Sequence, residues 1–106
     1  MAIGIYKGSP VSATATNATS AVATIAGVTG SINYITDIGG SSDKAASLLL
    51  VKQGSTVIWQ LQLGATTTGP FSYQFASPLT SAVGASVSVT VDGTALCNAN
   101  IAGYQL

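Results

Sequence analysis

The sequence predicts an all-β domain folded as a sandwich or barrel. Apolar and polar residues alternate with period two along much of the chain, short segments are separated by Gly- and Ser-rich turn signals, and no stretch has a helical pattern of convincing length. About seven to eight short strands with regularly spaced turns are typical of such folds. The 106 residues suit one domain with one hydrophobic core.

The N-terminal segment differs from the rest in composition. We interpret residues 1–19 as an arm and residues 20–106 as the β-sandwich domain. The arm is rich in small residues and contains two glycines and a proline, so a frayed terminus is the other interpretation. Ile3, Ile5 and Tyr6 are its candidate anchors for docking on a neighbour.

The first strands are predicted at residues 21–27 and 32–38. Alternation over the second of these places three side chains on a common face: Ile32, Tyr34 and Ile38. Residues 39–45 follow with two glycines, two serines and an aspartate, a composition that indicates a loop.

An apolar run at residues 47–53 is consistent with a strand buried on both faces or with a helical turn, and its length favours a strand. Residues 55–64 then give the clearest alternation of the chain. This pattern points four side chains inward: Val57, Trp59, Leu61 and Leu63.

Three further segments complete the expected sheets. Residues 70–75 alternate aromatic and polar side chains, and residues 84–93 alternate valines with Ser, Thr and Asp. The Asp92-Gly93 pair predicts a β-hairpin, because both residues tolerate positive φ. Residues 94–106 form the returning strand.

The charge pattern excludes several partners. Three lysines balance three aspartates, and Arg, Glu and His are absent, so the formal net charge is zero. Scattered lysines form no basic stripe for nucleic acid and no polybasic membrane patch. No apolar run approaches the ~20 residues of a membrane span, and the N-terminus lacks a secretory pattern. A single cysteine forms no internal disulfide, so we expect synthesis in a reducing cytoplasm.

We expect neither catalysis nor a cofactor. Nucleophilic triads need a base that this chain lacks, and Cys97 lies in a predicted strand as a core thiol. A zinc site lacks its usual ligands. Asp37, Asp43 and loop carbonyls could supply some oxygen ligands for calcium, but solvated loop charges are the preferred interpretation.

The aromatic residues have two interpretations. Tyr34, Trp59, Phe71, Tyr73 and Phe75 could line a sugar-binding platform, but their alternation with polar residues favours the core. Near the C-terminus, two side chains are candidates for an interface: Tyr104 and Leu106.

The near absence of charge is the unusual feature of the composition. The polar faces must be covered largely by the 26 Ser and Thr residues. Chains with little charge and no net charge tend to associate. The composition therefore favours a protein that works inside an assembly.

An ordered set of motifs resembles a known group of proteins. "NYITDI" is followed by an apolar strand, "F-x-x-P-L" at Phe75–Leu79, "G-x-x-V-x-V" at Gly84–Val89 and a terminal "CNANIAGYQL". This order, over residues 20–106, resembles small capsid decoration or cement (head auxiliary) proteins of tailed bacteriophages. The likeness lies in spacing more than in identity.

The resemblance implies a jelly-roll-like antiparallel β-sandwich that assembles as a homotrimer. It implies binding to the major capsid protein, so that the chain decorates or cements the capsid surface of the virion with help from its arm. No catalytic residue is carried over. The alternative is a carbohydrate- or receptor-binding module of a head fibre, spike or tail.

Overall fold

The computed structural model describes residues 9–44, 47–62 and 68–106, which form eight β-strands. The strands are β1 (Ser9–Asn17), β2 (Ser20–Ile25), β3 (Asn33–Ser42), β4 (Leu48–Gln53), β5 (Thr56–Gln62), β6 (Thr68–Thr80), β7 (Val87–Asp92) and β8 (Cys97–Gln105). Within these ranges no helix is long and apolar enough to cross a membrane. The predicted all-β class is confirmed.

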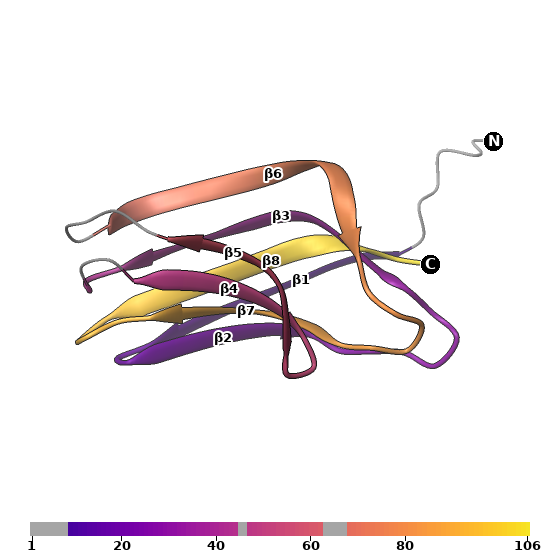
Figure 1. Cartoon of the computed structure of the whole chain (residues 1–106), viewed down its shortest axis with the longest axis horizontal. Coiled ribbons are helices and arrows are strands. Elements are labelled where there is room, and N and C mark those ends of the chain that lie inside the picture. The colour runs from indigo at the N-terminus through magenta and orange to yellow at the C-terminus, as the bar shows by residue number, and fades with distance from the viewer. Residues whose placement is uncertain (1–8, 45–46, 63–67) are drawn as a thin grey trace.

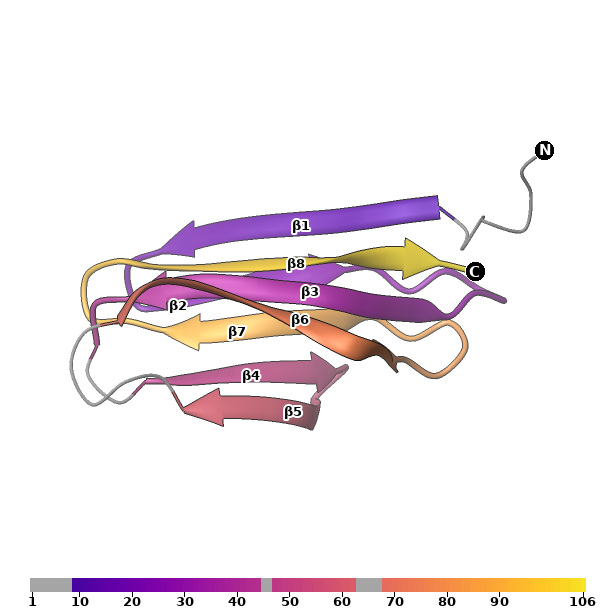
Figure 2. The same cartoon turned by 90° about the horizontal axis from the view of Figure 1, so that it is seen from above.

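The strands form two four-stranded antiparallel sheets, with orders β1-β8-β3-β6 and β2-β7-β4-β5 (Figures 1 and 2). The chain pairs as a nested set, β1 with β8, β2 with β7, β3 with β6 and β4 with β5. A doubled chain of this kind, rolled so that its pairs alternate between two sheets, is a jelly roll. The predicted jelly-roll-like sandwich is confirmed.

The core lies between the two sheets. Period-two alternation places every second side chain of β2, β4, β7 and β8 on the inner face, where it is buried. The largest inner side chains with almost no exposed surface are Ile35, Ile38, Leu49, Val51, Val87, Val89, Val91 and Ile101. The valine row of β7 is therefore core, as the alternation predicts.

A bulge in β3 changes which side chains of that strand face the core. Against β8 the pairing register of β3 shifts by one residue between Ile35 and Asp37, so Thr36 is the extra residue there, whereas against β6 the extra residues lie in β6 itself. Ile35 and Ile38 are therefore both buried. The predicted common face of Ile32, Tyr34 and Ile38 is wrong, because the bulge breaks simple alternation.

The loop predicted at residues 39–45 is wrong over its first four residues, because β3 continues to Ser42. Gly39 and Gly40 allow the neighbouring strands to approach β3 closely. A Cβ on Gly39 would lie 2.8 Å from the carbonyl oxygen of Phe71, and one on Gly40 would collide with the carbonyl oxygen of Asn98. Residues 45–46 lie outside the described residues.

The β-hairpin predicted from Asp92-Gly93 is also wrong. β7 and β8 belong to different sheets, so the chain crosses the sandwich at this corner. The N–H of Gly93 donates to the carbonyl of Thr19 at 2.9 Å. A Cβ at this glycine would lie only 2.8 Å from the Cβ of Cys97. The glycine fits because the corner is tight.

The sandwich begins at Ser9 and not at Ser20. β1, which lies within the segment expected as an arm, pairs with β8 from Ser9 opposite Gln105 to Asn17 opposite Cys97. Alternate residues of β1 pack on the core, because this edge strand completes the sheet.

Candidate functional site

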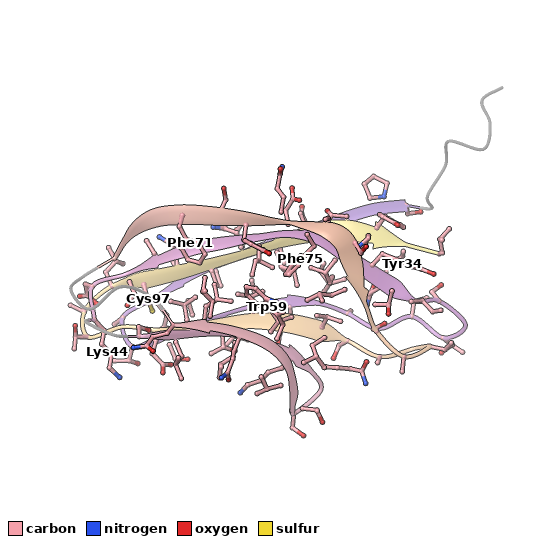
Figure 3. All side chains as sticks on the ribbon, turned by 45° about the horizontal axis from the view of Figure 1, so that its top comes forward. Tyr34, Lys44, Trp59, Phe71, Phe75 and Cys97 are labelled. Atoms are coloured by element: carbon pink, nitrogen blue, oxygen red, sulfur yellow. The ribbon has the colours of Figure 1, made fainter. Side chains whose placement is uncertain are left out.

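The candidate site is one long side of the sandwich, where β5 of one sheet and β6 of the other are both edge strands. The Trp59 ring lies 5.2 Å from the ring of Tyr73 and 5.1 Å from that of Phe75, measured between centroids. Tyr73 and Phe75 meet edge to face at 5.0 Å. Trp59 of β5 and Phe75 of β6 therefore bridge the two sheets (Figure 3). We call this surface the aromatic edge and define it by five residues: Val57, Ile58, Trp59, Tyr73 and Phe75.

The aromatic edge remains open to solvent. Tyr73 is 44% exposed, and Trp59 and Phe75 are half-buried against the core. An edge strand has a neighbouring strand on one side only, so its inward side chains are incompletely covered. Trp59, Phe71 and Phe75, expected in the core, instead form its partly exposed boundary.

A bulge in β5 adds apolar surface next to these rings. The register places Trp59 opposite Val51 but Val57 opposite Lys52, so Ile58 is the extra residue. Val57 and Ile58 are 43% and 37% exposed. The predicted inward position of Val57 is wrong for this reason. Leu63, the last residue of that predicted row, lies outside the described residues.

The aromatic edge has no charge of its own, since neither β5 nor β6 contains a charged residue. Soluble proteins commonly protect edge strands with charged side chains, because unpaired backbone groups recruit other strands. Here Pro78 in β6 and the bulge in β5 limit such pairing. The edge therefore favours contact through side chains with another uncharged surface.

The predicted interface residues near the C-terminus lie on a different part of the surface. The half-buried Tyr104 ring stacks on Tyr34, with centroids 4.9 Å apart and planes 8° from parallel. Leu106 is 54% exposed, and its backbone exchanges hydrogen bonds of 2.8 and 3.1 Å with Ile32. The other predicted interface residues lie outside the described residues: Ile3, Ile5 and Tyr6.

Asp43 has a structural role at the β7–β8 corner. Its carboxylate accepts hydrogen bonds from the backbone N–H groups of Thr94, Ala95 and Leu96 at 2.7, 2.8 and 3.0 Å. These donors, that of Thr94 first, lower the pKa of the Asp43 carboxyl. Asp37 lies elsewhere, in the bulged part of β3. No group of three metal-ligating side chains forms among the described residues.

Cys97 is a core thiol, as expected from its place in a predicted strand. Its side chain is fully buried. Its Sγ lies 3.3 Å from the carbonyl oxygen of Val91 and 3.5 Å from that of Asn17. Burial raises the pKa of the thiol, so the reactive thiolate is disfavoured.

No protein-family model matches the chain, and no curated protein matches it in sequence. Solved structures similar to it include the insecticidal crystal protein Cry2Aa, at 14% identity and TM-score 0.42. They also include dimeric latent PorU from Porphyromonas gingivalis, at 6% identity and TM-score 0.41. These alignments cover 83% and 94% of this chain but only 16% and 13% of the other two. Similarity at this level assigns neither a family nor a function.

Proposed function

We propose that this chain is a virion structural protein that assembles as a homotrimer and decorates or cements the capsid of a tailed bacteriophage by binding the major capsid protein. The observation that carries the proposal is the aromatic edge, an apolar and uncharged surface along two edge strands. Jelly rolls are frequent among viral capsid domains, which supports the proposal by analogy of fold only.

The physical argument concerns what a partner must supply. Burying a charge without a partner is costly, whereas apolar side chains can be covered at little cost, and so can hydroxyls that form a hydrogen bond across the contact. A second copy of the chain presents the same uncharged edge and therefore suits the first. A typical contact buries about 800 Å² on each partner. The whole chain exposes 5561 Å², so trimer and capsid contacts would cover a large share of it.

The first test is the native mass of the purified full chain, measured by size exclusion with light scattering over a range of concentrations. We expect a mass of three chains of 10.5 kDa. Val57→Asp should lower that mass, because it places a charge in the aromatic edge. Val22→Asp is the matched control, since Val22 is a similarly exposed valine (48%) on β2, the edge strand at the other side of the same sheet.

The masses of the parent and of the two variants decide whether the chain forms a trimer and whether the aromatic edge is its contact. A mass that falls in Val57→Asp and holds in Val22→Asp supports assembly through the aromatic edge. A parent protein that stays monomeric at all concentrations contradicts the trimer. The capsid assignment is tested separately, by adding the chain to phage shells and imaging them. A trimer that leaves every shell bare would refute the capsid role.

A further inference from the structure

A shallow groove crosses the outer face of the β1-β8-β3-β6 sheet. Its volume is about 320 Å³, and all four strands contribute to its lining. This is near the lower end of the roughly 300–1,000 Å³ common for small-molecule sites. The lining residues used below are Ser12, Thr14, Asp37, Gly39, Ser72 and Asn100.

The groove is hollow because its middle strands carry small side chains. Gly39 on β3 lies opposite Ser72 on β6 and Asn100 on β8. In the neighbouring row Ala102 lies between Asp37 and Ser12. The glycine and the alanine therefore provide a low floor of C–H groups between taller polar side chains.

Two of those polar side chains face the groove diagonally across β3 and β8. Asp37 pairs with Ala102, and Gly39 pairs with Asn100. Asp37 and Asn100 are therefore diagonal neighbours across β3 and β8. Diagonal neighbours in a sheet are separated by about 7–8 Å. Within the described residues, no side-chain hydrogen bond engages the Asp37 carboxylate or the Asn100 amide.

We propose that this groove binds a neutral sugar unit of a glycan. A carboxylate accepts hydrogen bonds from sugar hydroxyls, and an amide both donates and accepts them. The hydroxyls of Ser12, Thr14 and Ser72 lie around the same floor. The C–H face of a pyranose suits the C–H groups of that floor.

Charge selects among sugars. Among the lining residues that the structure describes, Asp37 alone is charged, so its carboxylate disfavours anionic groups such as sialate, uronate or phosphate. One carboxylate alone is also a poor site for calcium, which takes several oxygen ligands. Together with the hydroxyls and the amide of the lining, this favours an uncharged polyol over an anionic ligand.

The experiment uses the full chain in its native oligomeric state, titrated with a panel of neutral and anionic methyl glycosides and followed by NMR chemical shifts. We expect saturable binding of at least one neutral sugar, with a Kd on the order of millimolar for a ligand of this size. Asn100→Ala and Asp37→Asn should each weaken it at least tenfold. Their matched controls on the other sheet, Gln60→Ala and Asp92→Asn, should bind as the parent does.

Binding that fails in both groove variants and holds in both controls supports the site, provided that all four variants keep the parent's unfolding midpoint. The proposal is overturned if no neutral sugar saturates, if only anionic sugars bind, or if binding survives both groove substitutions. This inference does not rest on the capsid role. Native mass and shell occupancy are measured without sugar, so either proposal can fail alone.

Discussion

At the scale of single residues, Asp43 illustrates how one of the few charges is used. Its carboxylate accepts three backbone N–H groups of the β7–β8 corner, which would otherwise point into solvent at a tight crossing between sheets. Backbone donors are strengthened when their acceptor is ionised. The corner is therefore held by the charged form of Asp43.

We predict that this contact makes stability depend on pH. The backbone donors hold the folded pKa of Asp43 below its ordinary value of 3.8. The ionised form therefore stabilises the fold above that value, and the contribution is lost as the pH falls through the lowered pKa. Asp43→Asn should lower the thermal midpoint at pH 7, and its difference from the parent should shrink on acidification, as measured by circular dichroism.

The control for that experiment is Asp37→Asn. This substitution removes a carboxylate from β3, where Asp37 pairs with Gln74 of β6 and not with a residue of the β7–β8 corner. The Asp37→Asn protein should have a thermal midpoint at pH 7 near that of the parent. A loss at pH 7 as large as that of Asp43→Asn would show that net charge, and not the corner, sets the stability.

Residue identity also limits what the sequence can predict. The valines of β7 and the thiol of Cys97 are assigned to the core correctly, because regular alternation reports burial directly. Gly39 and Gly40 mislead, since glycine marks both loops and close strand contacts. Only the positions of the carbonyls of Phe71 and Asn98 in the folded sheet distinguish these cases.

At the scale of elements, β1 shows how composition and pairing can disagree. Its sequence, SPVSATATN, has small and polar residues typical of an unstructured terminus, yet it pairs with β8 along its whole length. Val11, Ala13 and Ala15 pack on the core. A strand of this composition is tolerated at the edge of the sheet, because the backbone of β8 provides hydrogen-bond partners for β1 along its length.

Truncation separates the two parts of the N-terminal segment. Removing residues 2–8 leaves all eight strands in place, so we expect the free energy of unfolding to change by no more than about 0.5 kcal/mol. Removing residues 2–17 deletes β1 and bares β8, so we expect a chain that no longer folds cooperatively in a urea titration. Equal stability of the two truncated proteins would place the start of the domain at β2.

Other element-scale features had no local signal. The bulge at Thr36 arises where β3 pairs with β8, a strand distant in sequence, and the bulge at Ile58 arises within the β4–β5 hairpin, so alternation alone placed some side chains on the wrong face. The Asp92-Gly93 pair has the chemistry of a hairpin, but the neighbouring sheets decide that the chain crosses there. The preference for the core over an exposed platform was wrong for Trp59 and Phe75, which are half-buried. Alternation shows that a strand has an inner face but not that it lies at an edge.

At the scale of the whole molecule, the nested pairing joins residues far apart in sequence. β1 pairs with β8 and β2 with β7, so two of the four nested pairs join strands that lie far apart along the chain. Folds dominated by such distant contacts are slow to form because loop closure costs entropy before contacts compensate for it. The overall class of fold was predictable from strand number, but this nesting was expected only from the resemblance to phage decoration proteins.

We predict folding on the millisecond to second scale, with fluorescence and far-UV signals changing together. The single tryptophan, Trp59 of β5, packs its ring against Phe75 of β6, so its fluorescence reports closure of the sandwich. Stopped-flow refolding from urea measures this. Refolding within microseconds would contradict the kinetic importance of the nested pairs.

The start of β1 and the end of β8 lie side by side, and this arrangement has a mechanical consequence. Ser9 lies opposite Gln105, and β1 begins at the end of the sandwich where β8 finishes (Figure 2). Hydrogen bonds between antiparallel strands run across the strands. Tension that draws the two ends apart therefore opens these bonds one after another, as in a zipper. Tension between Ser9 and the Asp43 corner at the far end would instead load the same bonds together in shear. The β1–β8 pair therefore opens more easily when it is pulled between Ser9 and Gln105 than when it is pulled between Ser9 and the Asp43 corner.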